Sequence, residues 1–257
     1  MRRLARAGLI PLALALPATV GGCLQSNSYG VEERLALPAA RAQVWAVAPA
    51  TNLSGEAGID PLLQADLLFA QLQTVRGIRA VPVNRVAEAY AGLRISGIAS
   101  AEDAQAVCLA VGADALIVPS ITLYDPYDPP RVGASIQVFA ADGTRLQGGE
   151  LPGAVAARQA MRTATDDAVT ARWQMDRPIA ASGDFLQQAG VFDASHGSVR
   201  GAALRWSAGR SDIDGPAGGR EVFLVADRYT SFVYHALLGR LMDELAQRRT
   251  AATALAE

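Results

Sequence analysis

Short apolar runs along the chain predict the strands of a sheet. Residues 44–49, 78–83 and 115–123 are mostly apolar and are bounded by turn-forming residues, a pattern typical of buried strands. The run 115–123 is the longest of the three. An apolar run without alternation indicates a strand that is covered on both faces. We therefore expect this strand at the centre of the sheet.

Capping signals between these runs predict helices. Asp60 suits an N-cap and Pro61 suits the first helical position, so a helix is expected over 61–75, with a stop at Gly77. The leucines of this segment cover more than one narrow stripe. This width predicts contact with a sheet and favours an additional contact with a second helix.

Two further helices are expected before the central strand. Asn84 can cap a helix over 85–93, and Ser100, which two acidic residues follow closely, can cap a helix that ends at Gly112.

A long hairpin is expected after residue 123. Prolines and tyrosines in 124–130 break the strand, and residues 132–140 alternate as a returning strand does. The dipeptide at 142–143 then predicts a two-residue turn into a short strand over 144–147.

The pattern beyond residue 149 is less regular. It predicts a helix over 155–173, a strand over 187–192, a strand or short helix over 199–206, and a loop over 209–219.

The C-terminal segment has a helical periodicity. Asp227 is the expected N-cap of an amphipathic helix over 228–248, and residues 250–257 are expected to fray. One face of this helix carries apolar side chains, namely Tyr229, Phe232, Val233, Ala236, Leu237, Leu241 and Leu245. A face of this size has to be covered. The sheet of the same chain is the expected cover, and a partner protein is the alternative.

Together these elements predict an α/β or α+β fold, in which helices pack on a mixed sheet and an amphipathic helix lies at the C-terminus. Hydrophobic residues make up 51% of the chain and can supply a core, while the net charge of −2 argues against binding to nucleic acid. We expect a single domain over 42–249, followed by the tail 250–257.

The N-terminal segment has the features of an export signal. Three arginines among the first six residues precede the apolar segment 7–20, which is too short for a transmembrane helix of about 20 residues. The sequence Val20-Gly21-Gly22-Cys23 resembles the lipobox of bacterial lipoproteins. The resemblance implies a signal peptide over 1–22, cleavage between Gly22 and Cys23, and acylation of Cys23 with palmitate. An ordinary secretory signal with a cysteine near its end is the alternative.

Acyl chains on Cys23 would anchor the protein to a membrane, since each buried methylene contributes about 0.8 kcal/mol. Residues 23–41 show little periodicity and are expected to form a tether. Leu24 and Gln25 follow the cysteine, whereas in the lipoproteins that this segment resembles an Asp there often marks the inner membrane. We therefore expect attachment to the outer membrane, facing the periplasm, with the periplasmic face of the inner membrane as the alternative.

The order of elements in the first half of the mature chain resembles a periplasmic α/β domain. The segments that carry the resemblance are 44–52, 61–75, 78–84 and 112–119. They resemble the amino-terminal domain of the Tol translocation protein B, the curli-secretion lipoprotein and the lipoprotein activators of penicillin-binding proteins. The resemblance implies an adaptor or assembly role in the cell envelope, without catalysis.

Candidate catalytic residues are few. Cys108 lies in an alanine-rich segment and is expected to be buried and unreactive. Asp193, Ser195 and His196 are the residue types of a hydrolase triad, but neighbours in sequence point in different directions, so loop or capping roles are expected. The second histidine, His235, is too far from His196 in sequence for a ligand spacing. No metal and no cofactor are expected.

The segment 124–130 is the candidate binding site. Tyr124, Asp125, Tyr127 and Asp128 stand among prolines, and aromatic surface on a stiff chain binds at low entropic cost. The functional interpretation is a partner-binding loop, and the structural one is a hairpin tip shaped by proline.

The sequence therefore predicts a membrane-anchored periplasmic lipoprotein that acts as a non-catalytic binding or envelope-assembly module, with an envelope protein as its partner. An envelope hydrolase with an unrecognised active site is the alternative. The identity of the partner and the oligomeric state stay open.

Overall fold

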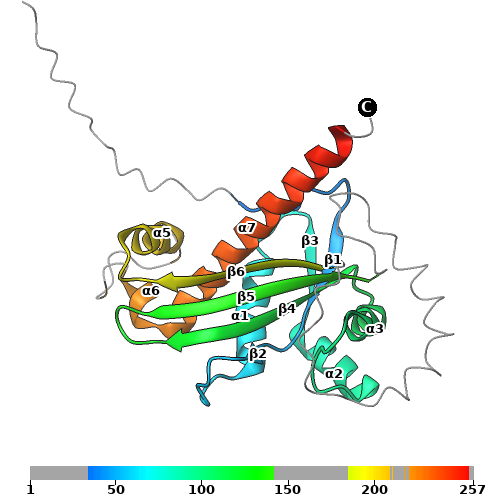
Figure 1. Ribbon diagram of the computed structural model, residues 1–257, viewed down its shortest axis with the longest axis horizontal. Helices are drawn as coiled ribbons and strands as arrows, with labels where there is room; N and C mark the ends of the chain where they lie inside the picture. Colours follow the sequence, from blue (N-terminus) through cyan, green and yellow to red (C-terminus); the bar gives the residue numbers. More distant parts are fainter. Residues whose placement is uncertain (1–33, 142–184, 209, 211–216, 218–219, 255–257) are drawn as a thin grey trace, which may run out of the picture.

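Helices pack on a mixed sheet in the computed structural model, which describes residues 34–141, 185–208, 210, 217 and 220–254 (Figure 1). The expected α/β class is confirmed. The strands are β1 (Gln43–Val47), β2 (Thr51–Asn52), β3 (Ile78–Val81), β4 (Ala115–Asp125), β5 (Arg131–Ala140) and β6 (Phe185–Asp193). The helices are α1 (Pro61–Leu72), α2 (Val83–Leu93), α3 (Ala101–Val111), α5 (Gly197–Ser207), α6 (Glu221–Leu224) and α7 (Ala226–Ala254).

The strand β4 lies at the centre of the sheet, as its apolar pattern predicts. The strand order is β3-β1-β4-β5-β6, and the short β2 pairs with β4 beyond the end of β1. β1 is parallel to β3 and β4, and β2 is parallel to β4. β5 is antiparallel to both β4 and β6. The sheet therefore has a parallel half and an antiparallel half, and β4 joins them.

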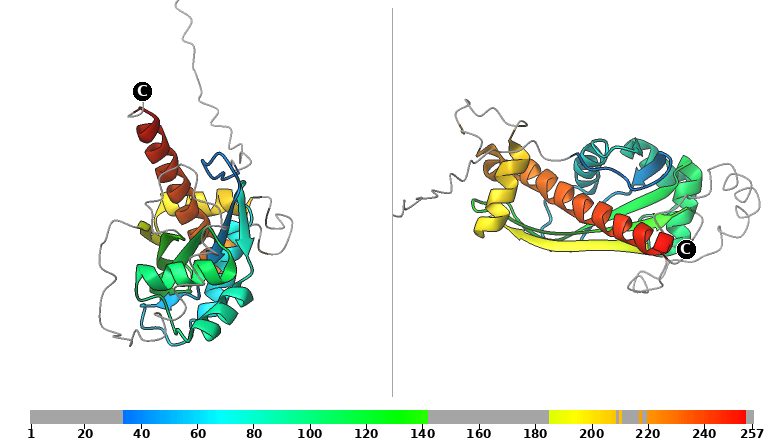
Figure 2. Two further views of the ribbon diagram at one scale, coloured as in Figure 1. Left: turned by 90° about the vertical axis from the view of Figure 1, so that its right-hand side faces the viewer. Right: turned by 90° about the horizontal axis from the view of Figure 1, so that it is seen from above.

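Helices cover both faces of β4, and its alternating side chains enter two cores. Ile117 and Ile121 belong to the core that α1 and α7 share, whereas Leu116 and Val118 belong to the core under α2 and α3. Figure 2 shows α7 crossing the sheet obliquely. The prediction that this strand is covered on both faces is confirmed.

The capping signals of α1 and α3 act as predicted. The Asp60 carboxylate accepts hydrogen bonds from the N–H groups of the residues at 62 and 63, and Ser100 forms a reciprocal capping box with Asp103. Gly112 ends α3 with φ +68°, and Gly77 follows a turn after α1 with φ +89°. Glycine adopts these left-handed conformations without strain.

Two boundaries around α2 and β4 differ from the predictions. The strand expected over 78–83 ends at Val81, because Pro82 cannot donate a hydrogen bond to the sheet, and the helix begins at Val83. Asn84 is therefore inside the first turn and is not the N-cap. The sheet pairing of β4 continues through Tyr124 and Asp125, so the loop of the hairpin is shorter than expected.

In the second half, the strand expected over 187–192 is confirmed as β6, and the segment over 199–206 is helical, as part of α5. The predicted turn and strand over 142–147, the helix over 155–173 and most of the loop over 209–219 lie outside the described residues.

The apolar face of the C-terminal helix is covered by the same chain, because α7 packs against α1, β5 and β6. Tyr234 and Leu238, outside the predicted face, are also fully buried, since α7 packs against α1 as well as against the sheet. Asp227 is in the first turn and is not the N-cap. The helix continues through Ala254, beyond the end predicted at residue 248.

Part of the predicted tether belongs to the folded body. The N–H of Leu37 donates to the carbonyl of Arg76, and the N–H of Arg76 donates to the carbonyl of Leu35. Both leucines pack against the main core. The boundary expected at residue 41 is therefore too late, because two apolar side chains in an otherwise irregular segment suffice to dock it.

Candidate functional site

The exposed tip of the β4–β5 hairpin carries the candidate loop. The N–H of Tyr127 donates to the Asp125 carboxylate at 3.3 Å, and the Asp128–Pro129 peptide bond is cis. The Tyr127 side chain is 80% exposed, whereas Pro130 is buried and its carbonyl accepts a hydrogen bond from the chain after β6. The structure thus displays one aromatic ring on a loop whose two ends are fixed.

Tyr124 has a different environment from Tyr127. Its side chain is half-buried and packs against the main core. Burial, and then the nearby Asp227 carboxylate, raises the pKa of Tyr124. Of the two tyrosines in the predicted loop, Tyr124 therefore anchors the hairpin and Tyr127 is available for contact.

Ion pairs connect the hairpin to its neighbours. Asp128 lies 3.6 Å from Arg220, which directly precedes α6, and Glu221 of α6 lies 2.9 Å from Arg228 of α7. These contacts connect the hairpin with the segment around α6, which is far from it in sequence. We call the surface formed by residues 124–131, 193–196 and 220–225 the hairpin end.

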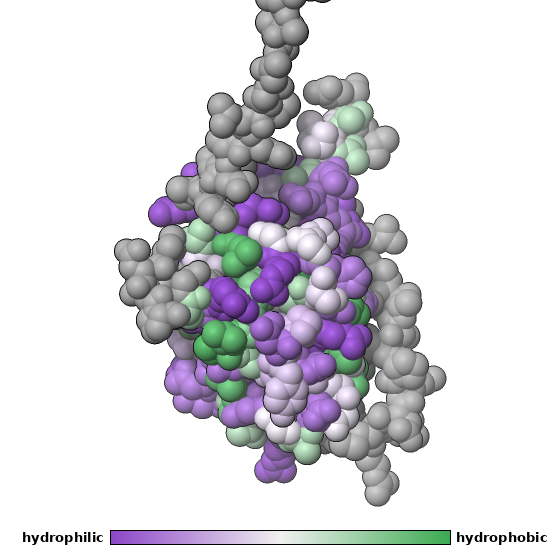
Figure 3. Space-filling view, turned by 90° about the vertical axis from the view of Figure 1, so that its left-hand side faces the viewer, coloured by the Kyte–Doolittle hydropathy of each residue, from purple (hydrophilic) through white to green (hydrophobic). Residues whose placement is uncertain are grey.

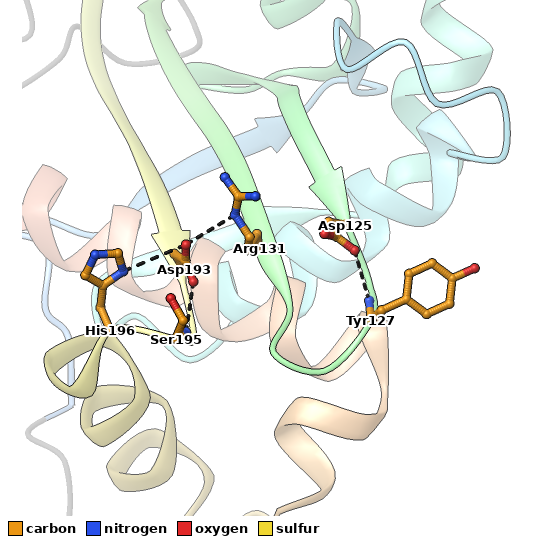
Figure 4. Close-up of polar contacts among 6 residues, drawn as sticks. All are labelled: Asp125, Tyr127, Arg131, Asp193, Ser195 and His196. Carbon is orange, nitrogen blue, oxygen red and sulfur yellow. Dashed lines mark hydrogen bonds and ion pairs between the residues drawn. The ribbon is translucent and has the colours of Figure 1, made fainter.

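A cross-strand ion pair forms the second side of the hairpin end. Arg131, the first residue of β5, is opposite Asp193, the last residue of β6, and their side chains lie 3.2 Å apart (Figure 4). Arg131 and Arg220 are not predicted as site residues from the sequence. Strand alternation alone does not give the register that pairs Arg131 with Asp193.

Asp193, Ser195 and His196 form the turn between β6 and α5. The backbone N–H of Ser195 donates to the Asp193 carboxylate at 2.8 Å, and Nδ1 of His196 lies 3.8 Å from the same carboxylate. Hydrogen bonds from the hydroxyl and then the backbone of Ser195 lower the pKa of Asp193. Because Ser195 and His196 both approach the carboxylate, the group has the geometry of a turn, as expected (Figure 4).

The large apolar side chains that are exposed in the described chain are unevenly distributed. They are Leu53, Leu62, Leu63, Tyr127, Val191, Leu224 and Val225. Tyr127, Leu224 and Val225 belong to the hairpin end. Leu62 and Leu63 lie at the start of α1, Leu53 precedes that helix, and Val191 lies near the end of β6. Figure 3 faces the hairpin end and shows hydrophobic residues among hydrophilic ones. Interfaces that form and separate are about as apolar as the rest of a protein surface, so this mixed composition is compatible with one.

The remaining candidate residues do not join this surface. Cys108 is fully buried, and burial, with the Asp114 carboxylate next in effect, raises the pKa of its thiol. His235 is buried in α7, whereas His196 is exposed at the start of α5. Gly22 and Cys23 lie outside the described residues.

The described ranges show neither a metal-ligand cluster nor a membrane-spanning helix. Within residues 34–141, 185–208 and 220–254, no three His, Cys, Asp or Glu side chains gather as metal ligands would. In the same part of the chain, no helix combines the length and the apolar character needed to cross a bilayer.

Neither a protein-family model nor a curated protein matches the sequence. Several solved structures resemble the chain loosely. A PelC variant from Paraburkholderia phytofirmans, described as a dodecamer, is 9% identical, with 80% of this chain and 90% of that chain covered and a TM-score of 0.32. Lipoprotein GNA1162 from Neisseria meningitidis is 13% identical, with 65% and 95% covered and a TM-score of 0.34. The hypothetical protein CT253 from Chlamydia trachomatis is 11% identical, with 80% and 94% covered and a TM-score of 0.33. Similarity at this level assigns no family.

Proposed function

We propose that this chain is a lipid-anchored lipoprotein of the bacterial envelope that acts as a non-catalytic binding or assembly module through its hairpin end. The exposure of Tyr127 carries the proposal. Its ring stands 80% exposed on a short loop, and covering such a ring with a partner would remove apolar surface from water at low entropic cost. The ion pairs of Asp128 and Asp193 hold the surface around it in place.

The non-catalytic role is supported by the arrangement at residues 193–196. A hydrolase needs its nucleophile hydrogen-bonded to a base, and the base oriented by a carboxylate. Here the backbone N–H of Ser195 and Nδ1 of His196 both approach the Asp193 carboxylate, and His196 is largely exposed at the surface. This geometry suits a turn better than a triad.

The anchor is supported by the sequence around Cys23. Eleven residues lead from Cys23 to Arg34, where the described body begins, and they can span at most about 40 Å at about 3.6 Å per residue. The body would therefore stay close to the membrane that holds Cys23, and the absence of Asp after the cysteine favours the outer membrane.

Site-specific crosslinking tests the contact surface. We would replace Tyr127 by a photo-crosslinking phenylalanine analogue in cells and use Glu88, an exposed residue of α2, as the matched control position. We expect a discrete adduct from position 127 that position 88 does not give, and that Leu224→Asp on the same surface removes. Identical adducts from both positions would contradict the role of the hairpin end.

A separate experiment tests the anchor. Cells are fed a palmitate analogue, and wild type is compared with Cys23→Ser. We expect label and membrane association in wild type only, with the variant released in a folded form because Cys23 precedes the body. An unlabelled wild type would refute the anchor and leave the crosslinking result unaffected.

A further inference from the structure

A cavity of about 310 Å³ lies at the edge of the sheet, between β6, α5 and α7. Its apolar lining includes Phe192 of β6, Val199 and Ala202 of α5, and Phe232 of α7. This volume is at the lower end of the range for small-molecule sites, which is about 300–1,000 Å³. An occupant would therefore be small and partly apolar.

The ionisable residues that line this cavity are all basic. Arg205 of α5 and Arg240 of α7 are exposed and lie where the cavity opens to solvent, whereas His235 of α7 is only 6% exposed. The lining contains no Asp or Glu among the described residues. The cavity therefore combines an apolar interior with a positive rim.

Neither arginine of the rim pairs with an acidic side chain in the part of the chain that the structure describes. Other exposed arginines do form such pairs: Arg131 with Asp193, and Arg220 with Asp128. Arg205 and Arg240 belong to no comparable pair among the described residues. Two guanidinium groups at one cavity without a carboxylate are suited to an anion from outside the chain.

The position of Arg240 is fixed by three contacts. Its guanidinium lies 5.1 Å from the centroid of the Phe192 ring and donates to the carbonyl of Ala189 at 3.4 Å. It also passes close to Gly190, where a Cβ atom would lie 2.9 Å from Nη1 of Arg240. The missing side chain at Gly190 thus leaves room for the guanidinium at the edge of β6. Because Arg240 is already held in place, its side chain loses less conformational entropy when an anion binds.

We infer that this cavity binds a small amphiphilic anion, a single-chain carboxylate or phosphate ester. Its charged head lies between Arg205 and Arg240, and its apolar body lies against Phe192, Val199 and Phe232. The planar guanidinium groups can each offer two parallel N–H donors to such a head, and the apolar side chains remove the body from water. The site uses residues other than those of the hairpin end, so it goes beyond the proposed function.

Calorimetric titration of the purified full chain tests this site. The probes are decanoate, decyl phosphate and decanol, each below the concentration at which it aggregates. We expect saturable binding of one molecule of either anion, with decanol weaker by tenfold or more. Comparing decanoate with decyl phosphate shows whether the site prefers a carboxylate or a phosphate. Equal binding of decanol and the anions, or no saturable binding, would overturn the inference.

Substitutions locate the binding. We expect Arg205→Gln and Arg240→Gln each to weaken anion binding about tenfold, the effect of one charge-assisted hydrogen bond. The matched control is Arg85→Gln, which removes the charge of an exposed arginine paired with Glu88 on the other face of the sheet and should leave binding unchanged. The Arg205 side chain forms no ion pair with the described residues, so its removal should leave the fold intact. An unaltered affinity in Arg205→Gln would therefore overturn the inference even if Arg240→Gln unfolds.

A filling substitution separates the cavity from general charge attraction. Ala202→Trp keeps both arginines and occupies the cavity, so it should abolish binding of decanoate while circular dichroism shows the wild-type helix content. Undiminished binding to this folded variant would place the anion elsewhere and contradict the site.

Discussion

The Tyr234 hydroxyl on α7 donates a hydrogen bond of 3.2 Å to Oε1 of Gln64 on α1, and both side chains are buried. The pair is a polar contact inside the packing of the two helices. Replacing Tyr234 with Phe would leave the Gln64 oxygen buried without this donor, which costs about 1–3 kcal/mol. We expect the free energy of unfolding, measured with urea, to fall by this amount. Tyr127→Phe, at an exposed ring, is the control and should change stability by less than about 0.5 kcal/mol. Equal effects of the two changes would contradict the role of the pair.

Stability is expected to fall at alkaline pH. Burial raises the pKa of Tyr234, and burial followed by the Asp103 carboxylate raises the pKa of Tyr90. The unfolded chain loses these protons near the ordinary tyrosine pKa of about 10, whereas the folded chain keeps them. The stability that these two protonated tyrosines contribute is therefore complete below about pH 10. It is lost as the pH rises above that value.

Urea unfolding at about pH 8 to 11 measures this dependence. The chain contains no lysine, so tyrosine and cysteine are the side chains that titrate in this range. The free energy of unfolding should decrease less steeply with pH in Tyr234→Phe than in wild type. A stability that does not change up to about pH 11 would contradict the prediction.

Leu237 tests the burial of α7. Its side chain is fully buried in the main core, so Leu237→Ala should cost about 2–5 kcal/mol through lost burial and a residual cavity. Leu62→Ala removes the same atoms from a side chain that is 46% exposed on α1, and it should cost much less. Thermal unfolding of both variants measures the difference. An unaltered melting temperature in Leu237→Ala would mean that the core does not depend on this helix.

Cys108 should be unreactive in the native protein. The thiol is fully buried and its raised pKa keeps it protonated, whereas the thiolate is the reactive form. In a Cys23→Ser background Cys108 is the sole cysteine, so maleimide labelling should require denaturant. Adding Ala57→Cys at an exposed loop position gives the positive control. Rapid labelling of native Cys108 would refute the burial.

The elements that the sequence predicts well are those whose signals are local. Asp60 and Ser100 cap their helices through side chains a few residues from the groups they bind, and Gly112 ends α3 because it can adopt a positive φ. The central position of β4 also follows from a local property, since its residues are apolar on both faces.

The features that the sequence does not reveal depend on contacts between distant segments. The docking of Leu35 and Leu37 requires Arg76, and the pair of Arg131 with Asp193 requires the β5–β6 register. The burial of Tyr234 beyond the predicted face of α7 requires α1 on its other side. Periodicity describes one element at a time, so it could not place these contacts or the cavity at Arg205.

The chain enters the body beside Arg76, where the N–H of Leu37 donates to the carbonyl just before β3 begins. This point is at the amino ends of the parallel strands, whereas Tyr127 lies past the carboxyl end of β4. For a body suspended from Cys23, the two positions define a proximal and a distal pole. Under the proposed anchor, Tyr127 would lie on the side of the body opposite to the point where the chain from Cys23 enters it. The proposed partner would then meet Tyr127 without competing with the bilayer for the same surface.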